Sequence, residues 1–413
     1  MQLVAYGAQD LFLTGTPEVT FWRAVTKRHT NFATEQIEQV FHGSVGWGKR
    51  ISCTVSRNGD LVNDMILEIT VKQTGPTWYP AEAIIKEIEL ELGGQKLDRH
   101  YSDWWRIYDE LFRSGEQKEA YKRMTNFSWT GEQSTGQVTR KLYLPLIFFF
   151  NKDPSLALPL VQLQFHELKL HITTASDYAS LGLAVDLDIK LYATFVFLDV
   201  EERKKFAASS TETLIEQLQF NGDEAKANNI RLTFNHPVKY LVWVMTHGSS
   251  AKHGLYNLSA PNKYFNSGVT VGMDSLDDMY NDCFAPIASA KLSLNGHDRF
   301  SERSGSYFNE VIPMQYCGTR PQAGIYMYSF ANEPRKHQPT GSANFSRIDN
   351  ATLNLKYKTY QSAKVTANAV TLQTEYGNQW GGAGADFSTV KVFCVNWNVL
   401  RIVSGMGGLA FSN

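Results

Sequence analysis

The feature that most constrains this chain is a β-rich pattern that occurs twice. Residues 90–99 (LELGGQKLDR) consist of an alternating strand, a glycine turn and a charged pair, and residues 292–300 (LSLNGHDRF) repeat that order. A second pattern follows each copy: a segment with Phe and Asn, then two prolines, then a strand-like run, first at 150–172 and again at 330–357. Because the copies lie a domain's length apart, the sequence predicts two similar β domains rather than short tandem repeats.

The length and composition of the chain agree with two domains. A single hydrophobic core rarely grows beyond about 250–300 residues, and this chain has 413. Apolar residues make up 43% and aromatic residues 13%, which is enough for two cores and excludes an intrinsically disordered chain. A charged and helical segment is expected near 200–220, beginning with EERKK at 201–205, and it separates the β-rich halves. We expect an N-terminal arm at 1–16, a first domain at 17–210 and a second domain at 211–413.

Three helices are predicted among the strands. Residues 16–18 (TPE) form a helix-start pattern and the apolar residues that follow share one face, so a helix that ends near Arg28 is expected. Residues 102–112 form a second amphipathic helix, with Trp105 on the apolar face that should cover the open end or side of the first domain. Residues 213–216 (TLIE) fit a capping box and predict a third helix.

Charge and cysteine content limit the class of protein. Lys and Arg number 40 against 41 Asp and Glu, a net charge of −1, without the basic excess that direct nucleic-acid binding normally requires. The N-terminal sequence has no secretory pattern, and the longest apolar run, 142–150, is too short to span a bilayer. Cysteines at 53, 283, 317 and 394 form no CxxC pair, as is typical of free thiols in a reducing compartment. We expect a protein made inside a cell, with no transmembrane segment.

No motif predicts catalysis, a cofactor or a metal site. The segment 166–171 (HELKLH) has its histidines five residues apart, and strand-like alternation places them on opposite faces, unlike a zinc-protease helix. The glycines at 405–408 lack the helix that a dinucleotide fingerprint must open, and the aspartates between 274 and 282 lack EF-hand spacing. The pairs Trp78–Tyr79 and Trp104–Trp105 favour core or interface packing over sugar stacking. The sequence therefore indicates that the chain is not an enzyme.

Several long blocks of sequence carry a family resemblance. They are QLVAYGAQD at 2–10, RHTNFA at 28–33, SRNGDL at 56–61, YPAE at 79–82, PLIFFFN at 145–151, LIEQLQF at 214–220, NFSRIDNATL at 344–353, NVLRI at 398–402 and SGMGGLA at 404–410. With these blocks in this order, the chain closely resembles the major capsid proteins of large icosahedral double-stranded DNA viruses, especially those of algal (chlorella) viruses. The blocks run almost from end to end, which makes the resemblance specific.

The resemblance implies both a fold and a function. The fold is all-β with short inserted helices, built as two consecutive eight-stranded antiparallel jelly rolls, which agrees with the duplication. The function is that of a structural protein of a viral capsid, which trimerises into a pseudo-hexagonal capsomer, tiles an icosahedral shell beside neighbouring capsomers and meets minor capsid proteins on the inner face. Such a protein resides in the virion and is assembled in the cytoplasm of the infected host cell. The stretch 246–285 departs from the family's pattern, which leaves open whether the chain is the main shell protein or a paralogue at special positions.

Two other functions are compatible with a jelly roll. A carbohydrate-binding protein is the alternative, because the same fold also builds lectins, and a glycan-processing enzyme is a third class. A tight trimer that is abundant in particles would favour the capsid protein, whereas elution from a sugar column by free sugar would favour the lectin.

The sequence also contains acceptors for sugar attachment. Asn-x-Ser/Thr patterns occur at Asn126, Asn257, Asn344 and Asn350, and the segment around Asn368 partly resembles the atypical glycan sites of the algal-virus proteins. We expect Asn344 and Asn350 to be bare and structural. Asn257 and Asn368 are the candidates for glycan attachment.

Overall fold

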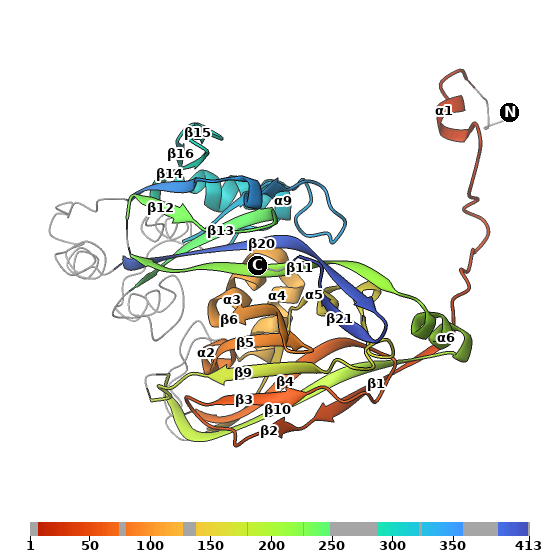
Figure 1. Ribbon diagram of the computed structural model, residues 1–413. Coiled ribbons are helices and arrows are strands. Elements are labelled where there is room, and N and C mark those ends of the chain that lie inside the picture. The colour runs from red at the N-terminus through yellow and green to blue at the C-terminus, as the bar shows by residue number, and fades with distance from the viewer. Residues whose placement is uncertain are drawn as a thin grey trace.

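Each half of the chain forms a pair of antiparallel sheets, and the two pairs lie one above the other in Figure 1. The computed structural model describes residues 7–73, 80–126, 138–179, 181–225, 227–247, 287–321, 324–357 and 387–411. The first sheet of the first half has the order β1 (Phe32–Gln39), β10 (Leu183–Leu198), β4 (Leu61–Gln73) and β7 (Val138–Pro145), with β8 (Leu158–Pro159) beside β4. The second has the order β2 (Phe41–His42), β3 (Arg50–Thr54), β9 (Leu168–Thr174), β5 (Ile85–Leu92) and β6 (Gln95–Tyr101).

The second half repeats this arrangement in its main strands. One sheet has the order β11 (Thr211–Ala225), β20 (Phe387–Val403), β13 (Pro237–His247) and β17 (Ile325–Ser329), with β18 (Ala343–Asn344) and β21 (Met406–Leu409) at its sides. The other has the order β12 (Asn229–Leu232), β19 (Ala351–Tyr357), β14 (Ile287–Leu294) and β15 (His297–Asp298), with β16 (Arg303–Ser304) beside β14. In both halves the first strand lies beside the last long one, which is followed in the same sheet by β4 and β7 in the first half and by β13 and β17 in the second. This order confirms two consecutive jelly rolls.

The turns explain why the duplicated pattern is visible in the sequence. Gly93 and Gly94 join β5 to β6 with φ values of 56° and 86°, and Asn295 and Gly296 join β14 to β15 with φ values of 50° and 77°. Two consecutive residues at positive φ match the right-handed twist of the paired strands, and glycine and asparagine adopt that conformation at the least cost. The two copies of the pattern are therefore the same hairpin in each jelly roll.

Alternating burial along the strands builds two cores. In β4, every second residue from Met65 to Gln73 is buried and the residues between them are half-buried, so that one face points into the first jelly roll. Strands β5 and β9 show the same alternation on the opposing sheet. This is the period-two pattern of a sheet with one face packed on a core.

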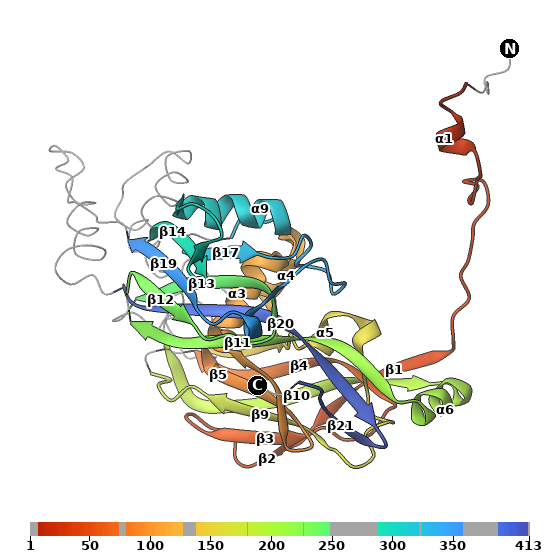
Figure 2. The same ribbon diagram turned by 45° about the horizontal axis from the view of Figure 1, so that its top comes forward.

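Short helices fill the connections. They are α1 (Leu11–Thr14), α2 (Pro80–Ile84), α3 (Ser102–Phe112), α4 (Gly115–Met124), α5 (Phe149–Lys152), η1 (Pro154–Leu156), α6 (Val200–Ala208), the π-helical turn η3 (Tyr307–Val311), α9 (Ile312–Cys317) and η4 (Phe345–Arg347). Helix α3 confirms the predicted helix at 102–112, but it lies between the two jelly rolls, so both of its faces are covered (Figures 1 and 2). No helix in the described ranges is both long and apolar enough to cross a membrane.

Helix α6 confirms the helical stretch expected at 201–205, but two other predicted helices are wrong. Residues 213–216 belong to β11, because pairing with β20 along thirteen registered positions outweighs a local capping pattern. Residues 17–31 contain no helix and continue as an extended segment. An isolated amphipathic helix of that length is marginal without a surface to pack against, and no other described residues cover these ones.

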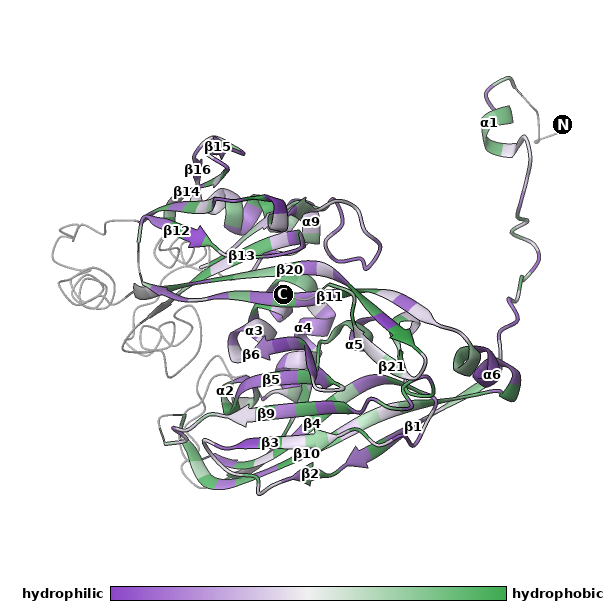
Figure 3. Ribbon diagram, in the orientation of Figure 1, coloured by the Kyte–Doolittle hydropathy of each residue, from purple (hydrophilic) through white to green (hydrophobic). Residues whose placement is uncertain are grey.

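Residues 7–31, which we call the arm, project away from the body beside α6 (Figures 1 and 2). Its apolar side chains are almost fully exposed: Phe12 at 92%, Phe21 at 94% and Trp22 at 96%. Figure 3 colours α1 as largely hydrophobic although it touches no sheet. Single exposed apolar residues are ordinary, but several exposed aromatic residues in one segment indicate that the segment binds another surface.

Candidate functional site

The two jelly rolls meet along a junction. On the side of the first jelly roll, the junction consists of a hairpin and helices. Strand β6 and helix α3 lie on the outer face of the β11–β20–β13–β17 sheet, the face turned away from the core of the second jelly roll. Ring centroids of Tyr101 and Phe220 are 4.9 Å apart, those of Trp104 and Phe393 are 5.8 Å apart, and Phe112 lies 5.1 Å from Tyr240. This aromatic contact is the apolar part of the junction.

Hydrogen bonds and ion pairs fix the register of the junction. The Gln217 amide donates to the carbonyl oxygen of Leu97, and the Leu218 N–H donates to Asp98 Oδ1 at 3.0 Å. Lys391 Nζ lies 2.6 Å from Asp103 Oδ2. Because these groups leave water when the jelly rolls meet, each needs its partner, and the contact tolerates one relative placement of the two bodies.

A buried charge cluster crosses the same junction. Glu216 of β11 accepts from Lys152 of the first jelly roll at 2.8 Å and from Lys239 of the second at 2.6 Å. Lys239 also donates to the carbonyl oxygen of Lys336 at 2.6 Å and lies 4.8 Å from the ring centroid of Trp397. Burial alone would raise the pKa of Glu216, but Lys152 and Lys239 outweigh it and hold that pKa at about 2. The carboxylate therefore stays charged and forms an ion pair with each of the two lysines.

A second buried carboxyl lies behind α3. The Tyr121 hydroxyl donates to Glu82 Oε1 at 2.6 Å, and both side chains are buried. Burial raises the pKa of Glu82 to about 7, although Arg106 and the Tyr121 hydrogen bond act in the opposite direction. In the folded protein Glu82 thus keeps its proton at a pH at which an unfolded chain has lost it.

This shift predicts a pH dependence of stability. Because the folded-state pKa of Glu82 is raised, the folded state binds more protons than the unfolded state between about pH 4.5 and 7. The free energy of unfolding should therefore decrease as the pH rises through that window. In Glu82→Gln the decrease should be reduced, and in the exposed control Glu119→Gln it should remain as in the wild type. Urea unfolding at several pH values measures this; equal slopes in all three proteins would contradict the prediction.

The outward surfaces at the corresponding places of the two jelly rolls are not covered by other described residues. The outer face of the β1–β10–β4–β7 sheet is the counterpart of the face that the junction covers, yet Phe32 is 54% exposed and Tyr143 36% exposed, whereas Phe393 and Tyr240 at the junction are at 0% and 2%. The counterpart of α3 is the η3–α9 segment, which follows β16 as α3 follows β6. Its outward residues Val311 and Met314 are 48% and 67% exposed.

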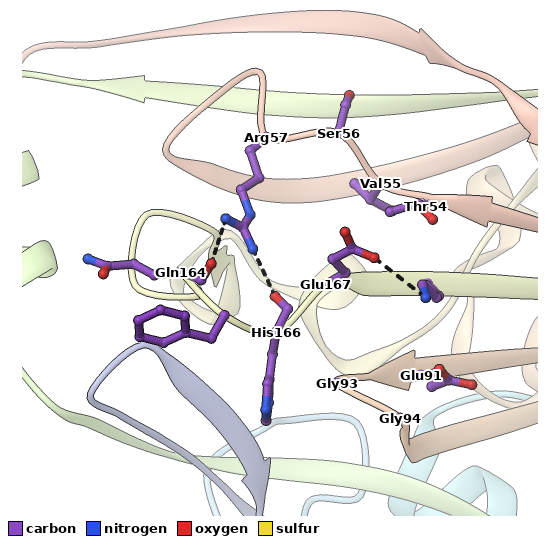
Figure 4. Close-up of a pocket in the computed structure, with 12 residues that line it drawn as sticks. Thr54, Val55, Ser56, Arg57, Glu91, Gly93, Gly94, Gln164, His166 and Glu167 are labelled. Carbon is purple, nitrogen blue, oxygen red and sulfur yellow. Dashed lines mark hydrogen bonds and ion pairs between the residues drawn. The ribbon is translucent and has the colours of Figure 1, made fainter.

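A pocket of about 650 Å³ opens between the end of β3, the β5–β6 turn and the loop before β9. The Arg57 guanidinium donates to the carbonyl oxygens of Gln164 at 2.9 Å and His166 at 3.2 Å, which fixes that loop (Figure 4). The Phe165 side chain lines the pocket and is 72% exposed. Gly94 at the floor has open space where a side chain would stand. The pocket therefore combines an exposed aromatic ring with charged side chains of both signs, and no described residue of the chain is inserted into it.

The predicted candidate residues separate into structural ones and ones outside the described residues. His166 Nδ1 contacts the carbonyl oxygen of Gly407 at 2.7 Å and His171 Nε2 contacts Glu91 at 3.0 Å, so the two histidines have different partners. In the described ranges, no three His, Cys, Asp or Glu side chains gather as a metal site would require. Trp104 and Trp105 are buried, as core packing predicts.

Outside the described residues lie Asn257, Asn368, the aspartates 274–282 and the pair Trp78–Tyr79. Asn344 Oδ1 accepts from the Ser346 N–H at 3.1 Å and begins η4. Sequence reasoning missed the buried cluster and the pocket, because Lys152, Glu216 and Lys239 are far apart in the chain and each alone looks like a surface residue.

Fold and surfaces together define a capsid protein of the double jelly-roll class. The chain belongs to the family of large eukaryotic DNA virus major capsid proteins: that family's model matches residues 202–408, and the model of the major capsid protein N-terminus matches residues 20–199. The protein is thus a structural component of a virion capsid and not an enzyme.

Relatives match over the whole length. The major capsid protein of Paramecium bursaria Chlorella virus 1 is 44% identical over 100% of this chain and 99% of its own, and that of Pyramimonas orientalis virus is 40% identical with the same coverage. Among solved structures, a chain of the quasi-atomic model of the PBCV-1 virus capsid gives a TM-score of 0.82 at 40% identity, covering 95% of this chain and 100% of that one. The Faustovirus major capsid protein, at 12% identity and a TM-score of 0.68 over 96% and 94% of the two chains, shares the fold.

Proposed function

We propose that this capsid protein forms a homotrimer that serves as a pseudo-hexagonal capsomer and tiles an icosahedral shell. The observation that carries the proposal is the imbalance between its equivalent surfaces. The outer sheet face of the second jelly roll is covered by β6 and α3, while the same face of the first is exposed. A second copy can supply the missing cover with its own η3–α9 segment.

The contact repeated between copies would resemble the junction within one chain. In it, Val311 and Met314 of one copy pack on the half-buried Ile66, Tyr192 and Val196 of the next, as Trp104 packs on Phe393 within the chain. Such a head-to-tail contact is heterologous and forms a closed ring if the rotation closes. Three chains then present six similar jelly rolls around one axis, an outline that packs into hexagonal arrays.

Association should be tight because obligate interfaces are large and apolar. Light scattering of the purified protein should report about three chains at sub-micromolar concentration. Met314→Arg should shift the protein to single chains, since an unpaired charge buried in the contact costs about 3 kcal/mol or more, roughly a hundredfold in affinity. Met314 is 67% exposed in the single chain, so its folding should be unaffected.

Val185→Arg is the matched control. Val185 is also exposed, at 62%, but it lies near the start of β10, whereas α6 follows the other end of that strand. It should leave the trimer intact. A wild-type protein that stays a stable monomer and is eluted from a sugar column by free sugar would contradict the capsomer and support the carbohydrate-binding alternative.

Four further expectations belong to this proposal. The chain divides at residues 210 and 211 into two domains with one jelly roll each. Minor capsid proteins meet the capsomer on its inner face, on the side from which the arm leaves (Figure 1), and assembly takes place in the host cytoplasm. Asn257 and Asn368 are the proposed glycan-attachment sites.

A further inference from the structure

The arm and the pocket beside Phe165 lie at the same end of the molecule. Phe32, where the arm joins β1, pairs with Leu198 of β10. The Leu198 N–H donates to Asp60 Oδ2 at 2.9 Å, and Asp60 lies three residues after Arg57, which lines the pocket. The arm and the pocket therefore lie on one side of the molecule.

We propose that the arm of one copy inserts Phe21 and Trp22 into the pocket of a second copy. Two aromatic residues with 94% and 96% exposure match a cavity whose wall is the exposed ring of Phe165 and whose guanidinium, on Arg57, is already held in place by two carbonyl oxygens. Aromatic rings gain from contact with another ring and with a guanidinium face. The proposal rests on the trimeric capsomer proposed above, since that assembly supplies the second copy.

The direction of the arm favours a second copy over its own body, and its length is sufficient. Residues 22–31, which separate the aromatic pair from β1, could extend by about 33 Å, more than the radius of gyration of roughly 22 Å expected for a compact chain of 413 residues. In Figures 1 and 2 the arm continues outward from β1 and does not turn back. An arm that leaves in this direction meets a neighbouring molecule first.

The cations of the arm add to the match. Arg23, Lys27 and Arg28 follow the aromatic pair, with Glu18 as the one acid between residues 16 and 31. At the pocket rim, the side chain of Glu167 is 58% exposed and pairs with Lys169 only at 3.5 Å. Glu167 can therefore accept an arm cation without losing a strong bond.

The second jelly roll has an equivalent pocket that serves as an internal control. It is lined by Asn295, His297 and Asn344 among others and has a volume of about 580 Å³. Its aromatic residue, Phe330, is half-buried and offers less ring surface than Phe165. An aromatic segment should therefore prefer the first pocket.

Cross-linking between full-length variants tests the proposal. Trp22→Cys and Glu167→Cys are co-expressed and treated with a short bis-maleimide; each carries one new thiol, so a linked pair must come from two copies. Cys53, Cys317 and Cys394 are buried and should not react, and both variants carry Cys283→Ser so that the fourth native thiol is absent. We expect a linked dimer at least ten times more abundant than in either variant alone or in Trp22→Cys with Asn344→Cys. Equal yields at Glu167 and Asn344 in an intact trimer would overturn the arm inference alone.

Limited trypsin digestion gives a second readout in the unlinked protein. If the arm is held in the pocket, cleavage at Arg23, Lys27 and Arg28 should be slow in purified trimers and about tenfold faster in Phe165→Ala. Rapid cleavage in both proteins, with light scattering still reporting trimers, would overturn the inference and indicate that another capsid component holds the arm. Loss of the trimer itself in the wild type would contradict the proposed capsomer instead.

Discussion

Trp105→Ala should lower the free energy of unfolding by about 3–5 kcal/mol, the usual cost of removing a large buried aromatic side chain. Trp105 is 1% exposed, and its ring lies edge-on to His100 with centroids 6.2 Å apart. Since α3 is enclosed by both jelly rolls, the cavity cannot collapse by moving the helix toward solvent. Urea unfolding followed by circular dichroism measures the loss.

Trp22→Ala is the matched control, because it removes the same side chain from a position that is 96% exposed. Its free energy of unfolding should stay within about 0.5 kcal/mol of the wild type. A Trp105→Ala protein that unfolds at the wild-type urea concentration would show that this tryptophan does not contribute to the core.

Glu216→Gln should be the second strongly destabilising change, by about 3–5 kcal/mol, since removing one partner of a buried ion pair leaves an uncompensated charge. Here two cations, Lys152 and Lys239, lose their shared carboxylate, and they belong to different jelly rolls. Glu212→Gln is the control on the same strand. Its pair with Arg401 is exposed on both sides, at 60% and 61%, so the loss should be within about 0.5 kcal/mol.

The same residue predicts a decrease of stability in acid. The pKa of Glu216 is held at about 2, below its unfolded value of about 4.3, so the folded state binds fewer protons in that range. The stabilisation is complete above about pH 4.3 and is lost as the pH falls through about 2. Glu216→Gln should lose less stability than the wild type between pH 4.5 and 2.5; parallel curves for the two proteins would contradict this assignment.

The duplicated architecture could be predicted from the sequence because its evidence is local. A β-hairpin depends on residues that are neighbours in the chain, and Gly93–Gly94 and Asn295–Gly296 adopt the backbone conformation that their types favour. The helix at 102–112 was equally visible, because its amphipathic period extends over three turns.

Local evidence was misleading where long-range contacts decide the conformation. The capping-box pattern at 213–216 is overridden by the pairing of β11 with β20, about 180 residues further along the chain. The helix expected to end near Arg28 does not form, and its apolar residues are not covered by the part of the chain that the structure describes. The buried cluster around Glu216 and the pocket beside Phe165 each combine segments whose proximity only the folded chain establishes.

Helix α6 carries the chain from β10 into β11 and so tethers the two jelly rolls covalently. A short tether gives the junction an effective concentration in the millimolar range, far above that of free capsid protein in dilute solution. Half of the six lateral contacts in the proposed ring would therefore form during folding, at any dilution, and only the other half would obey mass action. Dilution should release whole chains from the ring and never single jelly rolls, so the smallest soluble assembly intermediate is a two-lobed body with its arm still free.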